Sequence, residues 1–188
     1  MLKCPNWDRR KSTKSGARML RVYRTPKKLL IMKTQIGIKE APQAEIAHQL
    51  AKLLADEFVL YTKTRNAHWN VEGADFYNKH KFFEDQYTEL EVVIDETAER
   101  IRTLGHYAPG TLREFLELTD LTEASRETND SKGFIRALLA DHQTIIVRLR
   151  ESIDPIASKG KDFGTSDYLT GLMEKHEKMA WMLRAHLE

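Results

Sequence analysis

Four side chains near the middle of the sequence belong to the types that bind transition metals. They are His68, His80, Asp95 and Glu99. Two imidazoles and two carboxylates together form a mixed nitrogen and oxygen set that suits iron, zinc or manganese. Whether one chain can unite these four groups depends on the elements that carry them.

Two long amphipathic helices are expected to carry the set. Over residues 42–70, apolar side chains recur at the three- and four-residue spacing of a helix that has proline in its first turn. After a short segment around Gly73, a second apolar stripe covers 76–104, with Asp75 as N-cap and Gly105 as C-terminal stop. Because the connection is short, the two helices should be antiparallel neighbours.

The two halves of the set lie at different heights along these helices. His68 and His80 flank the turn at Gly73 and should lie side by side. Asp95 and Glu99 share one face of the second helix, but fifteen residues separate His80 from Asp95, which corresponds to about 22 Å. If the second helix packs antiparallel against its two-fold mate, the His80 end of one copy meets the Asp95 end of the other. The isologous interface then generates the site twice, so the spacing predicts a metal site shared between two copies.

Ordinary structural interpretations compete with this metal site. His80 lies on the apolar stripe, where a hydrogen-bonded core histidine is a common occurrence. The acidic residues within 95–99 could form a solvated face tied to Arg100 and Arg102. Like charges four residues apart repel each other, and a bound cation would reverse that cost, which favours the metal site.

At these positions the chain resembles the Dps-type miniferritins, the DNA-protection-during-starvation members of the ferritin superfamily. The His, His, Asp, Glu spacing matches the intersubunit ferroxidase signature of that family. The similarity extends from about Met32 to the C-terminus. The matching residues are His-Trp-Asn-Val at 68–71, then Phe76, His80, Phe83, Glu84 and Tyr87, then Asp-Glu-Thr-Ala-Glu-Arg-Ile at 95–101 before Leu104 and Gly105.

The resemblance implies an all-α, ferritin-like four-helix bundle with a short helix in the crossover between the second and third long helices. By the same resemblance, His68 and His80 of one subunit and Asp95 and Glu99 of its mate bind iron, Fe(II) or Fe(III). Trp69 lies beside the site, either as a core aromatic or as an electron donor that takes up stray oxidising equivalents. Family members form a hollow dodecamer, oxidise Fe(II) preferentially with hydrogen peroxide and store the ferric product. We therefore expect a ferroxidase and iron-storage protein that protects DNA from oxidative damage.

Other acidic residues are candidates for iron handling by the same resemblance. Asp162 and Asp167 lie in a segment that ordinarily reads as a loop and N-cap, and in the family this segment lines the three-fold channel that admits iron. Glu84 and Asp85 follow His80 by about one turn and are candidates for mineral nucleation on the cavity wall.

The remaining sequence predicts the other helices of the bundle. We expect a short helix at 111–118, a long one from an N-cap at Ser131 to Ile153 before Pro155, and a last one at 165–187. A di-iron centre within one subunit needs Glu-x-x-His pairs on two facing helices. The sequence does not place such pairs on two facing helices, so this kind of centre is not expected. The sequence has no apolar run long enough for a membrane span. The other histidines show no ligand grouping: His48, His106, His142, His176 and His186.

Composition predicts one bundle domain at 34–188 behind a basic extension at 1–33. The chain has 188 residues and is 41% hydrophobic, enough for one sizeable core. Its single cysteine, Cys4, excludes an internal disulfide and fits a reducing compartment such as the cytoplasm. The net charge of +2 conceals a split, because residues 1–33 hold eleven Lys or Arg and one acid, whereas 34–188 hold nineteen and twenty-seven.

The basic extension has three interpretations. Multiplied over an oligomer, a polycation could bind DNA phosphates without sequence preference, and the protein would then be associated with the nucleoid. Its Arg, Ser and Thr content also suits a cleavable targeting peptide. Alternatively translation starts at Met32, and the preceding residues are an upstream extension. The rival to the enzyme is thus a non-catalytic nucleoid protein that binds DNA with this tail, although such a role would not require the four metal-binding residues.

Overall fold

The computed structural model describes residues 34–123 and 129–188, which form five helices and no strand. The predicted basic extension at 1–33 lies outside the described residues. The helices are α1 (Glu40–Asn70), α2 (Phe76–Thr103), α3 (Leu112–Leu118), α4 (Ser131–Ser158) and α5 (Phe163–Ala185). The all-α four-helix bundle with a short helix in the crossover is therefore confirmed. None of the helices in the described part is long and apolar enough to cross a membrane.

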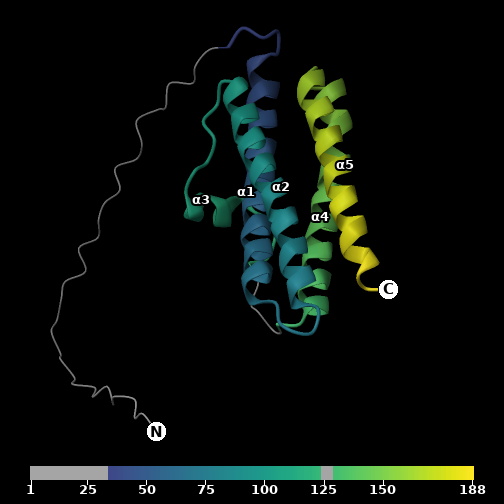
Figure 1. Cartoon of the computed structure of the whole chain (residues 1–188). Helices are drawn as coiled ribbons and strands as arrows, with labels where there is room; N and C mark the ends of the chain where they lie inside the picture. Colours follow the sequence, from purple (N-terminus) through teal and green to yellow (C-terminus); the bar gives the residue numbers. More distant parts are fainter. Residues whose placement is uncertain (1–33, 124–128) are drawn as a thin grey trace, which may run out of the picture. The chain divides into compact units, whose positions relative to one another are not determined.

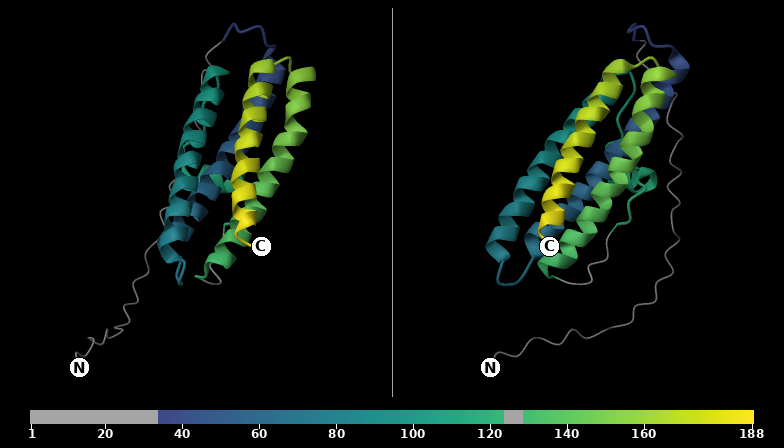
Figure 2. Two further views of the ribbon diagram at one scale, coloured as in Figure 1. Left: turned by 45° about the vertical axis from the view of Figure 1, so that its right-hand side comes forward. Right: turned by 90° about the vertical axis from the view of Figure 1, so that its right-hand side faces the viewer.

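The four long helices form two antiparallel pairs (Figures 1 and 2). The short turn after α1 folds α2 back along it, and a second turn does the same for α4 and α5. The crossover between the pairs carries α3, which packs against α1. Because each pair is joined by a short turn, sequence spacing near that turn fixes which of its residues are neighbours.

The core follows the predicted apolar stripes. Phe83 and Leu90 of α2 face the interior and are 0% exposed. Helix α4 contributes residues spaced three and four apart, so that one stripe stays buried along its length. The most deeply buried large side chains are Leu50, Leu54, Leu60, Phe83, Leu90, Ile101, Leu104, Ile135, Leu138, Ile145, Leu149 and Leu183.

Two predicted helix boundaries were wrong. Asp130, not Ser131, is the N-cap of α4, because its carboxylate accepts the backbone N–H of Gly133 at 2.9 Å. Pro155 does not end α4, which continues to Ser158. Proline lacks a donor but keeps its carbonyl, and the Pro155 carbonyl accepts the N–H of Lys159 at 3.0 Å in the last turn.

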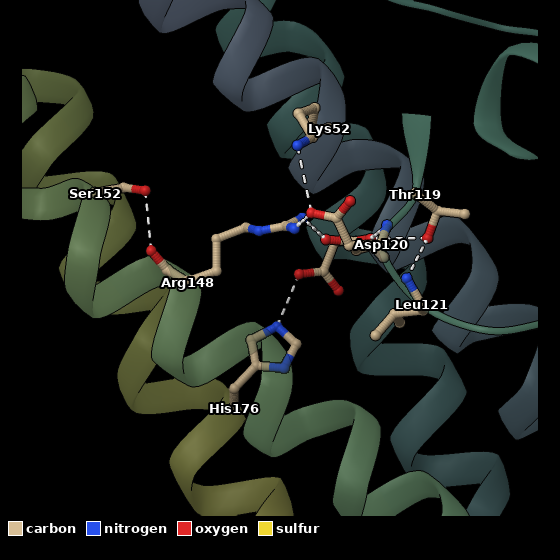
Figure 3. Close-up of polar contacts among 9 residues, drawn as sticks. Lys52, Thr119, Asp120, Leu121, Arg148, Ser152 and His176 are labelled. Carbon is tan, nitrogen blue, oxygen red and sulfur yellow. Dashed lines mark hydrogen bonds and ion pairs between the residues drawn. The ribbon is translucent and has the colours of Figure 1, made fainter. Parts of the chain in front are cut away.

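A buried carboxylate fastens the crossover to the bundle (Figure 3). Asp56 of α1 is 1% exposed and accepts from the Thr119 hydroxyl at 2.7 Å and the Asp120 backbone N–H at 2.8 Å. Arg148 of α4 forms ion pairs with both Asp56 and Asp120. Burial raises the pKa of Asp56, while Thr119 and Arg148 oppose that shift. These contacts hold the chain after α3 between α1 and α4.

Candidate metal centre

The two predicted histidine ligands meet at the turn between α1 and α2. His68 occupies the last turn of α1, and His80 lies in the second turn of α2. Gly73 in the connecting turn adopts φ 125°, a conformation that a residue with a Cβ rarely takes. The two imidazole rings stack with centroids 3.8 Å apart and an interplanar angle of 22°.

A reciprocal pair of hydrogen bonds fixes the orientation of both rings. His68 Nδ1 lies 2.8 Å from the backbone carbonyl of His80, and His80 Nδ1 lies 2.8 Å from that of His68. A carbonyl oxygen only accepts, so each Nδ1 must carry a proton. In the neutral rings, each Nε2 then holds a lone pair. A hydrogen bond from Nδ1 to a backbone carbonyl is a common way to orient an imidazole so that its Nε2 can bind a metal.

Aromatic side chains and one cation surround the histidine pair. Tyr87 meets the His68 ring edge-on at 5.1 Å, and the Arg65 guanidinium lies 4.5 Å from the Tyr87 ring centroid and 5.2 Å from that of Trp69. Trp69 is 63% exposed. The interpretation of Trp69 as a core aromatic is therefore wrong within a single chain, because Trp69 lies on its surface.

The two predicted carboxylate ligands lie exposed on α2. Neither Asp95 nor Glu99 has a hydrogen-bond or ion-pair partner among the residues that the structure describes. Arg100 instead donates to the carboxylate that caps α5 at 3.0 Å, and Arg102 stacks over the Tyr107 ring at 4.3 Å. The acidic face tied to these two arginines is thus not formed.

One chain does not bring the four predicted ligands together. His80 and Asp95 both belong to α2, and their fifteen-residue separation corresponds to about 22 Å along a helix. Within residues 34–123 and 129–188, no three His, Cys, Asp or Glu side chains are grouped so that they could hold a metal ion. A complete site would therefore need groups from outside the described part of this chain.

Glu84, one helical turn beyond His80, is paired with a neighbouring lysine. The Lys81 ammonium donates to Glu84 Oε2 at 2.6 Å, and this contact lowers the pKa of Glu84. Asp85, the next residue, is exposed. The nucleation role of Glu84 and Asp85 therefore stays a prediction.

The two candidate pore residues differ in their surroundings. Asp162 is 3% exposed, caps α5 through the Thr165 N–H at 2.9 Å and pairs with Arg100 at 3.0 Å. Asp167, one turn into α5, is exposed. This placement gives Asp162 a structural task in the cap of α5, and the pore role of both residues stays a prediction.

Sequence reasoning missed a buried polar cluster in the bundle interior. Glu57, His142 and His176 come from α1, α4 and α5, and each is 0% exposed. A signal existed, because each replaces an apolar residue in a stripe spaced by three and four. In α4, for example, His142 lies between Leu138 and Ile145.

Comparisons with known proteins agree with this architecture. A family model described as a ferritin-like domain matches residues 47–188. The chain is 39% identical to a low temperature-induced protein of Nostoc sp. over 81% of this chain and 86% of that protein. It is also 39% identical to the DNA protection during starvation protein 2 of Bacillus anthracis, over 76% of this chain and 97% of that protein.

A solved structure gives the same result. The Dps protein of Vibrio cholerae O1, described as a member of a superfamily of ferritin-like diiron-carboxylate proteins, superposes with a TM-score of 0.78 and 31% identity. The match covers 82% of this chain and 96% of that one. The chain belongs to the ferritin-like family. Within that family it is a Dps-type miniferritin, and this membership supports iron storage and DNA protection in general.

Proposed function

We propose that the protein is a ferroxidase that binds Fe(II) between two subunits, oxidises it with hydrogen peroxide and stores the ferric product. His68 and His80 of one subunit and Asp95 and Glu99 of its mate would hold the substrate iron. The observation that carries this proposal is that the histidine pair is oriented for a ligand. The carboxylates, without partners in the described chain, lie too far along the same helix to reach that pair.

The donor set suits this chemistry. Free Fe(II) and peroxide yield hydroxyl radical by one-electron transfer, whereas two ferrous ions held side by side can give both electrons to one peroxide. Carboxylates are hard ligands that favour the ferric product, and neutral imidazoles keep the ferrous ion bound beforehand. Trp69, exposed beside the histidines, would then supply an electron when only one iron is present.

The surface around Asp95 supports docking of a second copy. Asp95 lies in an open groove between α1 and α2 whose other walls are mainly apolar. Val92 in this groove is 48% exposed. Exposure of this apolar side chain to water is unfavourable, and burial against another subunit would remove that unfavourable free energy. An isologous contact along α2 would place each His80 near the partner chain's carboxylates. The groove is lined by Phe58, Tyr61, Glu91, Val92, Ile94, Asp95 and Ala98.

A mixing experiment tests the shared site. His80→Ala and Asp95→Ala variants should each be slow at peroxide-driven Fe(II) oxidation, because each damages every site. In a mixed dimer both lesions fall in one site and the other site keeps all four ligands. Co-assembled mixtures should therefore regain part of the activity, with mixed assembly confirmed by native mass spectrometry.

The control is a mixture of His80→Ala with His68→Ala chains. Both lesions lie on the histidine side, so every site in the mixed dimer carries one lesion and no activity should return. A site confined to one chain would give no recovery in either mixture, and that result would refute the proposal.

For the assembly, we propose a homo-oligomer in the form of a hollow dodecamer. The two-fold contact completes the metal site, and a closed shell is needed to retain a mineral. Light scattering should give a mass near twelve subunits at micromolar concentration, and a stable monomer would exclude this assembly.

DNA binding is a second candidate, favoured by the charge split between residues 1–33 and 34–188. We propose that residues 1–33 are a basic extension to a bundle domain at 34–188 and that the protein acts in the cytoplasm, near the nucleoid. A chain that starts at Met32 should keep full ferroxidase activity and lose retention of supercoiled DNA, measured at several salt concentrations. Retention by the shortened chain would exclude the extension as the binding element.

A further inference from the structure

Three polar side chains form a connected chain through the bundle interior. His176 of α5 lies between Glu57 of α1 and His142 of α4. His176 Nε2 is 2.9 Å from Glu57 Oε1, and His176 Nδ1 is 2.9 Å from His142 Nδ1. Figure 3 shows the contact from the His176 ring to a carboxylate beside the Arg148 network. Because α1 packs chiefly on α2 and α4 on α5, this chain links the two helix pairs.

The arrangement does not suit a metal ion. The two nitrogens of the His176 ring point in different directions, one toward Glu57 and one toward His142. A single ion could not contact all three side chains without breaking one of these bonds. The three side chains are instead joined in series by hydrogen bonds, and each bond shares one proton between its two partners.

The geometry limits how many protons the chain can hold. In the bond between the two Nδ1 atoms, one ring must donate and the other must accept. If both His142 and His176 became imidazolium ions, two N–H groups would point at each other across 2.9 Å. His142 Nε2 and Glu57 Oε2 also lack hydrogen-bond partners among the described residues. A second imidazolium would therefore point one N–H at the other ring and leave the His142 Nε2–H without an acceptor among the described residues.

We propose that the Glu57–His176–His142 chain is an acid-sensitive latch in the bundle interior. Protonation of the second imidazole breaks the bond between the His142 ring on α4 and the His176 ring on α5, and it favours opening of α4 from α5. This inference does not depend on the proposed function, because none of the three residues belongs to the metal centre.

Electrostatics agree with the direction of this switch. Burial, followed by the charge of His176, holds the pKa of His142 well below its ordinary value of 6.5. Since an opened or unfolded chain would bind that proton near pH 6.5, the latch is intact above this pH. Its contribution is lost progressively as the pH falls below 6.5 toward the pKa of the folded state.

Other groups face the latch from the neighbouring helices. Helix α5 also supplies Tyr168, whose hydroxyl lies 2.6 Å from that of Thr97 on α2. Burial raises the pKa of Tyr168 to about 12, so it stays neutral in the acid range. The charges of Glu96 and Arg100 on α2 act on Tyr168 in opposite directions. Asp56, beside Glu57 on α1, titrates in acid as well, so the test must compare variants within the latch.

Hydrogen exchange of the assembled full-length protein tests the proposal. Exchange of α4 and α5 peptides is followed by mass spectrometry from pH 7.5 to 5.0 and corrected for intrinsic exchange. The equilibrium constant for opening should rise between pH 6 and pH 5, and this rise should be about eightfold larger in the wild type than in His142→Phe. The factor follows from one histidine that binds a proton near pH 6.5 in the open state but not in the closed state. His48→Gln, which removes an exposed histidine of α1, should keep the wild-type profile.

A second variant, His142→Gln, keeps the proposal testable if His142→Phe does not fold. His142→Gln keeps a side chain that can bond to His176 but does not titrate, so it should flatten the pH profile in the same way. Unchanged pH profiles in both His142 variants would overturn the latch, and so would a flattened profile in His48→Gln. Retention of Zn²⁺ by a His68→Ala, His80→Ala chain, lost on adding His142→Phe, would also overturn it by revealing a metal site.

Discussion

The protein contains two pairs of adjacent histidines, and their surroundings give them different chemistry. His68 and His80 donate through Nδ1 to backbone carbonyls, which leaves their Nε2 lone pairs for a ligand. His142 and His176 instead bond to each other through Nδ1 and are 0% exposed. The first pair is arranged to bind a cation, and the second is arranged to share a proton.

The comparison shows that the hydrogen-bond partner, rather than the residue type, decides what a histidine does. A backbone carbonyl cannot change its protonation state, so it fixes one tautomer at every pH. An imidazole partner can change its own state, so the bond between His142 and His176 depends on the number of protons present. Single substitutions at four positions should separate the behaviour of the two pairs, and the largest effect is expected at His176.

His176→Ala should destabilise the bundle without affecting its chemistry. Truncation leaves the Glu57 carboxylate buried without its partner, so the free energy of unfolding should fall by about 3–5 kcal/mol. Urea unfolding at pH 7.5 measures this change. His48→Ala, at an exposed position, should remain within about 0.5 kcal/mol of wild type. A loss below about 1 kcal/mol in His176→Ala would show that the contact from His176 to Glu57 contributes little to stability.

His80→Ala should have the opposite effect to His176→Ala: it should slow iron oxidation and leave the stability of the bundle nearly unchanged. Loss of one ligand from every site should slow peroxide-driven Fe(II) oxidation by about 100-fold. This is the upper end of the range seen when a group that holds a metal ligand in place is lost. The free energy of unfolding should change by only about 1 kcal/mol, because one hydrogen bond is lost. Stopped-flow absorbance of ferric product gives the rate. Wild-type oxidation by this variant would remove His80 from the site.

Glu84→Gln tests whether the histidine pair gains a further carboxylate. If Glu84 leaves Lys81 to contact the iron, its loss should slow the first oxidation steps by about tenfold. Asp85→Asn is the matched control, since it removes the neighbouring exposed charge. Equal slowing of later mineral growth in both variants, with fast initial oxidation, would support the nucleation role predicted from the sequence instead.

His186→Ala should have the smallest effect. The His186 ring lies edge-on to Phe82 at 4.6 Å, so its loss should cost about 0.5 kcal/mol and leave oxidation unchanged. Burial, then Lys79, lowers the pKa of His186 below 6.5, so its contribution should decline as pH falls through 6.5. Calorimetric melting at pH 7.5 and 5.5 compares this variant with wild type. A shift as large as that of His176→Ala would mean that any histidine loss destabilises this fold.

The sequence predicted most of the fold from local patterns. Apolar spacing located the five helices, and Gly105 stopped α2 as expected, with φ 82°. The errors fell at ends where competing signals exist, as at Pro155, where the retained carbonyl lets α4 finish its last turn. For the candidate site, the separation of His80 from Asp95 along one helix also followed from numbering alone.

Other features of the site required the tertiary structure. Spacing allowed Arg100 to pair with the acidic residues of its own helix, but only the packing of α5 against α2 places Asp162 beside it. The sequence also placed Glu84 one turn beyond His80. Only the structure showed that the Glu84 carboxylate accepts a hydrogen bond from Lys81.

What the sequence by itself determined was the set of helices, the face that each one buries and the neighbours across each short turn. Only the tertiary structure decided which buried faces meet. His176 and Glu57 are separated by 119 positions in the chain. A helical period identifies the buried side of a helix, but the axial offset and rotation between distant helices depend on how all the core side chains fit together.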